Sequence, residues 1–179
     1  MKEYVTDALV LGRRVHGARD IIVDLFTKDL GRIEARIVHA QRMNAKLLLH
    51  SNVLHGVRAR LVRTKGFTLA DAVTRSSSFC VLHHASSVAR MLGLCVLLRA
   101  LLPRAHQDAR LWSLCEDVWC GNEFSFSSFL VALGYNPLYE QCAVCSCAPV
   151  TAFVFHDHTF LCTQCAVQLP ENEVVLIYE

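Results

Sequence analysis

No apolar run in this sequence is long enough to cross a lipid bilayer. The longest, Met91–Leu98, has eight residues and lies between Arg90 and Arg99, whereas a membrane-spanning helix needs about 20. The first residues, Met1–Asp7, are polar and of mixed charge, unlike a secretory signal. Internal repeats and low-complexity segments are also absent. These absences argue against a membrane protein and predict a soluble, cytoplasmic one.

Basic side chains are scarce in the second part of the chain. Residues 76–179 carry 4 Lys/Arg against 9 Asp/Glu, whereas residues 1–75 carry 14 Lys/Arg against 7 Asp/Glu. The formal net charge of +2 therefore hides local charges of +7 and −5. This asymmetry indicates two modules with different partners, of which the first suits a polyanion such as nucleic acid.

Two further absences bear on function. The sequence lacks the His-x-Glu or Cys-x-Glu motif that precedes the cysteine pair of zinc-dependent nucleobase deaminases, so we predict no enzyme. Aromatic side chains are few in residues 1–75, which contain only Tyr4, Phe26 and Phe67. We therefore expect base stacking not to dominate any binding of nucleic acid by this part of the chain.

Four of the nine cysteines form a zinc-ribbon pattern. Cys142-x2-Cys145 is followed, after sixteen residues, by Cys162-x2-Cys165. Two tight turns of this kind can aim four sulfurs at one tetrahedral centre, which leaves no position for a catalytic water. The pattern predicts a structural Zn²⁺ ion held by Cys142, Cys145, Cys162 and Cys165.

Other interpretations of the cysteines stay open at this point. The quartet could form two disulfides or be a metal-free remnant, although a chain without an export signal favours thiols that bind metal. Cys147 could replace Cys145 as a ligand, and His156 or His158 could replace a cysteine. Four further cysteines lie in apolar or helical surroundings, where we expect small buried hydrophobic side chains: Cys80, Cys95, Cys115 and Cys120.

The first 75 residues have the pattern of a small β-barrel. Short runs rich in Val, Ile and Leu, separated by turn signals, predict five strands: Thr6–Arg14, Ile21–Thr27, Arg32–Val38, Val53–Arg63 and Phe67–Thr74. The longest connection, a loop or short helical turn around Gln41–Leu49, lies between the third and fourth strands. This order is typical of an OB-fold barrel, with an Sm-like or SH3-like barrel as the alternative.

Alternation along these strands predicts where the basic side chains lie. In the third strand Ile33, Ala35 and Ile37 would face the core, and the arginines between them would face outward. We predict that the outer surface contacts the phosphates of nucleic acid through residues that include Arg13, Arg14, Arg32, Arg36, Arg42, Lys46, Arg58 and Arg60. The plain alternative is an outer face that is polar only because it is solvated.

From Ser76 the pattern becomes helical. Ser76–Ser78 are predicted to cap a first helix that ends by Pro103, and a second helix spans Asp108–Val118. A third helix, Phe126–Leu133, should stop at Gly134. The predicted α+β organisation is an OB-fold barrel over 1–75, a helical domain over 76–141, and a four-cysteine zinc element with a tail over 142–179. In the tail, the apolar run Val174–Tyr178 is a candidate for one more strand.

The basic residues after position 75 all lie in a 21-residue window of the helical domain. Beside apolar helix faces, they could bind an acidic peptide that has a hydrophobic end. The alternative is a set of solvated arginines on helix surfaces. The residues of this predicted partner site are Arg90, Arg99, Arg104 and Arg110.

An ordered set of segments resembles the RecO family of bacterial recombination mediators. The segments are Ala8–Arg13, Asp20–Thr27 followed by Gly31, the basic stretch His39–Lys46, and Phe129–Pro137 ahead of Cys142–Cys145. The resemblance covers nearly the whole chain. It implies an N-terminal OB domain, a helical domain and a four-cysteine zinc element.

The resemblance also implies a function. It predicts binding of single- and double-stranded DNA, annealing of complementary strands, and help in loading recombinase onto DNA coated by single-strand-binding protein. The implied partners are RecR, RecF in some cases, and the acidic C-terminal tail of the single-strand-binding protein. The implied location is the bacterial cytoplasm, at the nucleoid. An RNA-binding or ribosome-associated protein with an OB fold and a zinc ribbon is the alternative.

Overall fold

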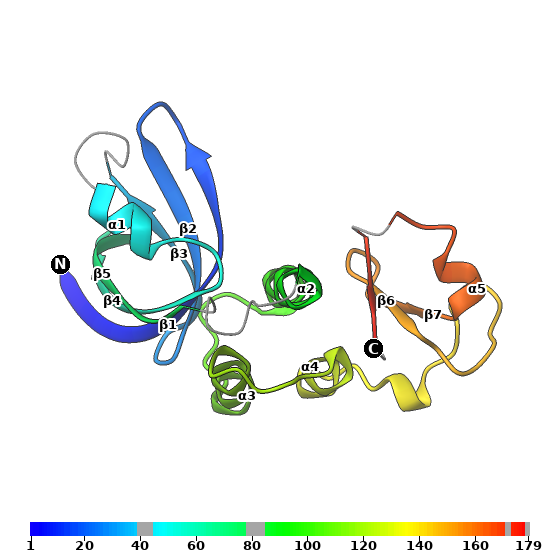
Figure 1. Ribbon diagram of the computed structural model, residues 1–179. Coiled ribbons are helices and arrows are strands. Elements are labelled where there is room, and N and C mark those ends of the chain that lie inside the picture. The colour runs from blue at the N-terminus through cyan, green and yellow to red at the C-terminus, as the bar shows by residue number, and fades with distance from the viewer. Residues whose placement is uncertain (39–44, 78–84, 171–172, 178–179) are drawn as a thin grey trace. The chain divides into compact units, whose positions relative to one another are not determined.

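The computed structural model (Figure 1) describes residues 1–38, 45–77, 85–170 and 173–177. The chain divides into two compact units, Met1–Asn122 and Glu123–Glu179. The first unit contains a barrel and three helices, and the second contains short helices and a small sheet with the four cysteines. The predicted α+β fold is therefore confirmed. The division into three domains stays a prediction, and the two units are described separately below.

Five strands of the first unit close into a barrel in the order β1-β2-β3-β5-β4. Their bounds are β1 Lys2–His16, β2 Asp20–Thr27, β3 Gly31–Ile37, β4 His55–Arg63 and β5 Phe67–Ser77. β3 and β5 pair in parallel, and the other pairs are antiparallel. β1 is longer than predicted because its first half pairs with β4 and its second half with β2.

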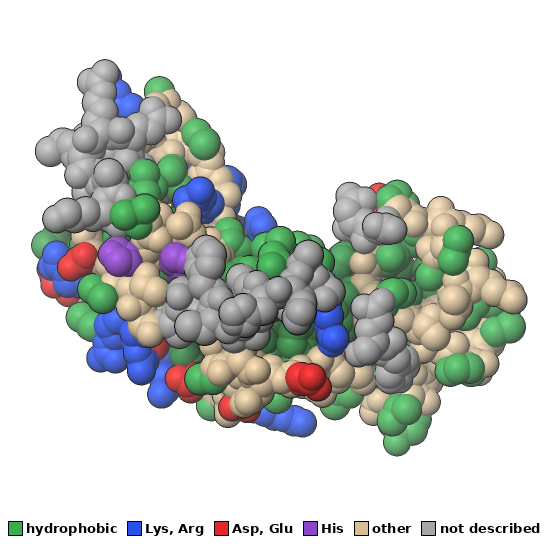
Figure 2. Space-filling view, viewed as in Figure 1, with side chains coloured by type: hydrophobic (Ala, Val, Ile, Leu, Met, Phe, Trp, Pro, Cys, Tyr) green, Lys and Arg blue, Asp and Glu red, His purple; other side chains and the backbone are tan. Residues whose placement is uncertain are grey.

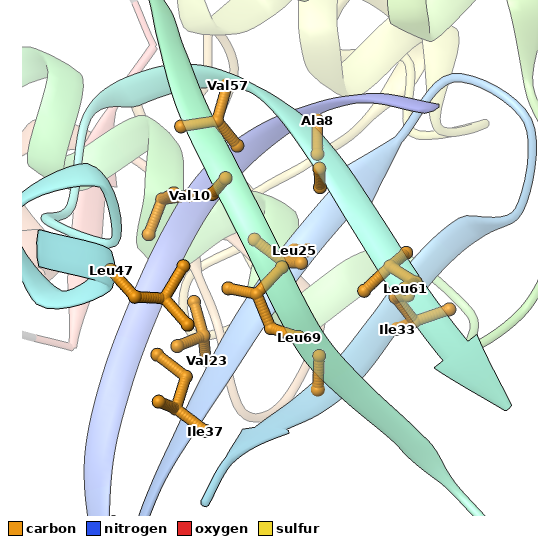
Figure 3. Close-up of a cluster of buried hydrophobic side chains, with 13 residues drawn as sticks. Ala8, Val10, Val23, Leu25, Ile33, Ile37, Leu47, Val57, Leu61 and Leu69 are labelled. Carbon is orange, nitrogen blue, oxygen red and sulfur yellow. The ribbon is translucent and has the colours of Figure 1, made fainter. Parts of the chain in front are cut away.

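Alternate residues of the strands fill the barrel with aliphatic side chains (Figure 3). Ile33, Ala35 and Ile37 of β3 are buried, as their spacing predicts. One end of the barrel is closed by α1, Ala45–His50, whose Leu47 joins the core. Figure 3 shows Leu47 beside Ile37, whereas Leu61 and Ile33 lie toward the other end. The barrel interior is therefore a packed core with α1 at one end.

Two helices follow the barrel, α2 Ala85–Leu101 and α3 Ala109–Trp119. α2 packs against β1. α3 begins after Asp108, whose carboxylate accepts a hydrogen bond from the Leu111 N–H at 2.8 Å, as predicted. Its Trp112 ring lies 5.5 Å from the ring of Phe26 on the outer wall of the barrel. No helix in the described part of the chain is both long and apolar enough to cross a membrane.

The predicted serine cap of the first helix is wrong for Ser76 and Ser77. Both residues belong to β5, where they pair with the first residues of β4. Pairing along β4 therefore extends the strand into the serine run, and α2 begins only at Ala85. Ser78 lies outside the described residues.

Gly31 allows the segment after α2 to lie against the barrel at the start of β3. Its φ is +68°, and a Cβ at this position would lie 2.0 Å from the carbonyl oxygen of His106. The neighbouring Ala105 N–H donates to the Arg32 carbonyl at 2.8 Å. Only glycine combines this conformation with so close an approach. The segment after α2 is thereby held against the start of β3.

The second unit begins with α4, Phe126–Ala132, and a 3-10 helix, Pro137–Tyr139. Gly134, with φ +94°, follows the end of α4, as predicted. A three-stranded sheet in the order β7-β6-β8 and the short helix α5 complete the unit. Their bounds are β6 Ala152–Val154, β7 Thr159–Leu161, α5 Thr163–Ala166 and β8 Val174–Leu176. β8 is the strand that the last apolar run predicts.

A buried ion pair joins the barrel to α2. The Arg32 guanidinium donates to both carboxylate oxygens of Asp24 at 3.1 Å, and to the carbonyl of Leu102 at 3.1 Å. Asp24 also accepts from Arg99 of α2 at 3.3 Å. The side chains of Asp24 and Arg32 are only 3% and 13% exposed. Arg32, predicted as a DNA contact, therefore joins β2, β3 and the end of α2.

We expect Arg32→Leu to destabilise the first unit by about 3 kcal/mol, because it leaves the buried Asp24 carboxylate without its bidentate partner. Arg60→Leu is the control: Arg60 on β4 pairs with Glu3 at 3.6 Å, and these two side chains are 48% and 51% exposed. Its loss should cost about 1 kcal/mol or less. Urea unfolding followed by circular dichroism measures both, and equal costs would contradict the assignment.

Candidate metal centre and nucleic-acid interface

The four cysteines of the zinc-ribbon pattern converge in the second unit. The sulfurs of Cys142, Cys145, Cys162 and Cys165 all lie within 4.8 Å of one another. The Cys145 and Cys162 sulfurs are 3.6 Å apart. A tetrahedral zinc ion with Zn–S bonds of about 2.3 Å needs sulfurs about 3.8 Å apart. The quartet therefore forms a cluster that could bind a metal ion, and its four thiol ligands fit zinc.

The first pair of ligands lies on a tight turn. The Ser146 N–H donates to the Cys142 carbonyl at 2.8 Å, and the Cys142 N–H donates to the Cys147 carbonyl at 3.0 Å. Ser146 has φ +57°, which reverses the chain directly after Cys145. These bonds bring the side chains of Cys142 and Cys145 to the same side of the turn.

The second pair is brought back by the β6–β7 hairpin. Phe153 and Phe160 are directly paired across it, with ring centroids 5.1 Å apart. The Ala143 N–H donates to the Phe160 carbonyl at 2.9 Å, which ties the first turn to β7. Cys162 then precedes α5, and its carbonyl accepts from the Ala166 N–H at 3.0 Å. Cys165 lies one helical turn later, so both sulfurs face the first pair.

The surroundings of the sulfurs suit a bound cation. Backbone N–H groups of Cys162 and Cys145 lower the pKa of the Cys142 thiol to about 6. Desolvation and the neighbouring thiols raise the pKa of Cys165 to about 12. Without a metal ion, four thiolates at this spacing repel one another. A divalent cation removes that repulsion, and all four ligands would then come from the chain.

The alternative ligands lie apart from this cluster. Cys147 is exposed and contributes its carbonyl to the turn, but its thiol is outside the group of four. His158 shares a hydrogen bond of 2.7 Å with the Tyr135 hydroxyl. His156 lies 3.2 Å from the neighbouring Asp157 carboxylate. Among the described residues, the metal-ligand geometry is thus that of the predicted quartet.

Two of the remaining cysteines are buried, as predicted. Cys95 and Cys115 are buried in the first unit, and burial raises the pKa of both thiols, that of Cys95 to about 12. They are inert core residues. Cys120 is exposed at the end of α3, so the expectation of burial is wrong there. Cys80 lies outside the described residues.

We expect the purified protein to contain about one zinc ion per chain, and Cys162→Ser to lose it. Cys147→Ser should keep the metal, because its sulfur lies outside the cluster. Metal analysis by mass spectrometry gives the zinc content. Thermal unfolding should show a destabilised second unit in Cys162→Ser, since the metal contributes directly to folding. Zinc loss in both variants alike would contradict the ligand set.

Most arginines predicted to contact DNA are paired with carboxylates. Four of them lie on the outer face of the barrel, where Figure 2 shows basic side chains close to acidic ones. The pairs are Arg14–Glu34 at 3.1 Å, Arg36–Asp20, Arg58–Asp7 at 3.1 Å and Arg60–Glu3 at 3.6 Å. We call these four pairs the ion-pair belt. The carboxylates of these pairs are already subtracted in the local charge of +7, so the excess positive charge lies on other basic residues of this part of the chain.

Arg13 differs from the belt. Its guanidinium donates to the amide oxygen of Asn52 at 2.9 Å, a neutral partner, and it is exposed. Arg42 lies outside the described residues, as does the side chain of Lys46. The DNA contacts of all eight residues stay predictions. Among the arginines of this set that form ion pairs, Arg32 has the least exposed side chain.

The arginines of the predicted partner site do not form one cluster. Arg99 pairs with the buried Asp24, and Arg104 donates to Glu34 at 2.9 Å. Arg90 is partly buried on α2, and Arg110 is exposed on α3. Two of the four therefore meet the predicted DNA-binding arginines at shared carboxylates: Arg99 at Asp24 with Arg32, and Arg104 at Glu34 with Arg14.

The DNA contacts predicted from the sequence do not include two basic residues that lie beside aromatic rings. Lys2 lies over the ring of Tyr4, and Arg63 over the ring of Phe67. The strand register brings these residues together, since Lys2 pairs with Arg63, and Arg63 pairs with Phe67. The period-two pattern of β1, in which Lys2 and Tyr4 share a face, is the signal that could have found them.

A comparison with family models finds a match over the barrel. Residues 1–76 match the model of the recombination protein O N terminal. The barrel is thus similar to the N-terminal domain of the RecO family. The resemblance is confirmed over the barrel, and the match ends at the penultimate residue of β5. Comparison with curated proteins gives no match.

The RecO N-terminal domain implies a protein of recombination and DNA repair. RecO proteins are generally mediators rather than enzymes, and the family suggests DNA and recombination proteins as partners. The match covers the ion-pair belt and the aromatic residues at the start of β1 and β5. It does not cover the cysteine cluster, whose assignment depends on its geometry alone.

One member of the belt makes stability depend on pH. A hydrogen bond from Arg14 and the charges of Arg104 and Arg32 lower the pKa of Glu34 below its ordinary value. A carboxylate of this kind stabilises the folded state above its unfolded pKa, and the contribution is lost as the pH falls.

Between about pH 5 and pH 3, we therefore expect Glu34→Gln to lose less stability than the wild type. The difference should be about 0.5–1 kcal/mol, because Arg14 is half-exposed and the pair is screened. The midpoint of urea unfolding at each pH measures it. Glu140→Gln, at an exposed position with no ion pair among the described residues, should behave like the wild type. Parallel curves for all three would refute the role of Glu34.

Proposed function

We propose that this chain is a non-enzymatic DNA-binding mediator of recombinational repair. It would anneal complementary single strands and help to load recombinase onto DNA coated by single-strand-binding protein. The observation that carries this proposal is the RecO N-terminal match over a closed five-stranded barrel. The proposed partners are single- and double-stranded DNA, RecR, RecF as a further candidate, and the acidic tail of single-strand-binding protein.

Annealing requires neutralised phosphates and accessible bases, and no nucleophile. Phosphate contacts release counterions, so the affinity falls steeply with salt concentration. The belt arginines are about half-exposed, which lets a phosphate compete with each carboxylate for the guanidinium. Arg13 has only a neutral partner and can bind phosphate at a smaller cost. We propose Arg13 as the strongest single contact and the belt as a weaker set.

In this proposal the zinc ion is structural. Four thiolate ligands leave no open coordination position, so the metal would stabilise the turns of the second unit. The arginines of the helical segment remain our proposed site for an acidic peptide. Arg110 supports this best, because it is exposed and makes no ion pair within the described residues. Arg104 would have to exchange Glu34 for the peptide.

The direct test is annealing of complementary strands that have been coated with single-strand-binding protein. We expect the chain to accelerate annealing, and its affinity for a labelled single strand to fall strongly with salt concentration. Arg13→Gln should reduce the slope of log affinity against log salt by about one. Arg14→Gln, at the adjacent position, should reduce it less because Arg14 is paired with Glu34.

Three results would contradict the proposal. Affinity that barely changes between low and moderate salt would remove the electrostatic account. An absence of annealing on coated strands would remove the mediator function even if DNA is bound. Competition between RNA and single-stranded DNA of equal length completes the experiment, and a strong preference for RNA would favour a ribosome-associated role instead.

A further inference from the structure

One end of the barrel carries aromatic and basic side chains in place of aliphatic ones. Leu47 of α1 closes the opposite end. At this end the inward-facing positions continue from Leu61 to Arg63 on β4, and from Thr6 through Tyr4 to Lys2 on β1. Phe67 begins β5 directly opposite Arg63. We call Lys2, Tyr4, Arg63 and Phe67 the barrel-mouth cluster.

The two rings of the cluster form one aromatic surface. The centroids of Tyr4 and Phe67 are 6.0 Å apart, and the ring planes meet at 63°. Both rings pack against the barrel core, and both remain partly accessible to solvent. This differs from Phe26, the third aromatic residue of the barrel, which is fully buried against α3. The fold thus joins two of the three aromatic residues into one accessible pair.

Positive charge surrounds the rings. The Lys2 ammonium lies 5.0 Å from the Tyr4 centroid, and the Arg63 guanidinium lies 5.5 Å from that of Phe67. The Arg63 guanidinium, by hydrogen bonding, also lowers the pKa of the Tyr4 phenol. Lys65, in the turn between β4 and β5, is exposed. Within the described residues, none of these three cations forms an ion pair, in contrast to the belt.

Two acidic side chains near this end have partners other than the barrel-mouth cations. The Asp29 carboxylate accepts a hydrogen bond of 2.6 Å from the Thr6 hydroxyl, next to Tyr4 on β1. The Glu3 carboxylate pairs with Arg60 on the outer face. A ligand of this surface therefore needs a planar, polarisable group for the rings and negative charge for the cations. A nucleotide has both groups close together, because its planar base lies next to its negatively charged phosphate.

We infer that the barrel-mouth cluster is a stacking site for one unpaired base of a single-stranded nucleic acid, with Lys2, Arg63 and Lys65 binding the phosphates beside it. This inference rests on the nucleic-acid binding proposed above and specifies which part of the barrel reads single strands. The bases of a duplex are stacked on one another, so their faces are closed to Tyr4 and Phe67. The cluster therefore favours single strands, whereas the belt contacts phosphates of either form.

The test compares two strands that differ only in their bases. One is an oligothymidylate, and the other is an abasic strand with the same number of phosphates. Fluorescence anisotropy at one fixed salt concentration measures the affinity of the full chain for each. A stacked base contributes about 5- to 150-fold in affinity. We expect the wild type to prefer the oligothymidylate by a factor in this range.

Substitutions then assign the preference to the rings. Phe67→Leu and Tyr4→Leu should lose most of the preference while keeping the wild-type affinity for the abasic strand, which shows that they are folded. Tyr4→Phe retains the ring and should retain the preference. Tyr139→Leu is the matched control, because it removes an aromatic residue that is 85% exposed but lies in the second unit.

A second measurement needs no variant. An oligonucleotide that contains 5-iodouracil crosslinks on irradiation to an aromatic side chain on which the base stacks. We expect the crosslinked peptide of the wild type to contain Tyr4 or Phe67. Crosslinks confined to other aromatic residues would overturn the inference, even if both leucine variants fail to fold.

The outcomes separate this inference from the proposed function. If the wild type binds both strands equally, the stacking site is refuted and phosphate binding by the barrel stands. If the preference survives in Phe67→Leu and Tyr4→Leu, the cluster is refuted as its source. If the wild type binds neither strand, the proposed DNA-binding function itself fails.

Discussion

A buried carboxylate, Asp24, is the point on which the first unit depends. It lies on β2, almost fully covered, and accepts hydrogen bonds from Arg32 of β3 and Arg99 of α2. A charge in this position would be very costly without such partners. Because the three residues come from three elements, the pair fixes the barrel wall and the helix after it together. The bond from Arg32 to the Leu102 carbonyl extends this connection to the end of α2.

Ion pairs between arginines and carboxylates also determine where the positive charge of the barrel is available to a ligand. Counting residues gives a strongly positive N-terminal part, but acidic side chains of the barrel take up arginines in ion pairs. Among the described residues of the barrel, the remaining positive charge lies at Arg13 and Arg19, at the barrel-mouth cluster and on exposed lysines of the turns. In the proposed function, electrostatic attraction of DNA would be concentrated at these places, and the belt would add contacts only where a phosphate displaces a carboxylate. Such a division would allow one barrel to hold a strand while leaving most of its bases open to pairing.

The two units have different sources of stability. The barrel buries an aliphatic core that Leu47 of α1 joins, and α2 and α3 bury further apolar side chains outside this cluster. The second unit buries a few aromatic and aliphatic side chains, with Phe153 between Tyr135 and Phe160. Its small sheet of three-residue strands is too short to be stable alone. A metal ion held by the four thiolates would supply the stability that so small a core cannot, which is a physical reason for the cysteine quartet in this unit.

The sequence by itself determined the local features of this protein. Period-two alternation in β3 predicted its buried residues, Asp108 and Gly134 marked helix ends, and the spacing of four cysteines predicted their convergence. These signals act over a few residues or through strict geometry, so they survive without knowledge of the fold. Only the tertiary structure decided the rest. Strand pairing between segments far apart in the chain decides which arginines form ion pairs with carboxylates. The same pairing brings the rings of Tyr4 and Phe67 into contact. Alternation assigns a side chain to a face, but the partner on that face is fixed by register and barrel closure.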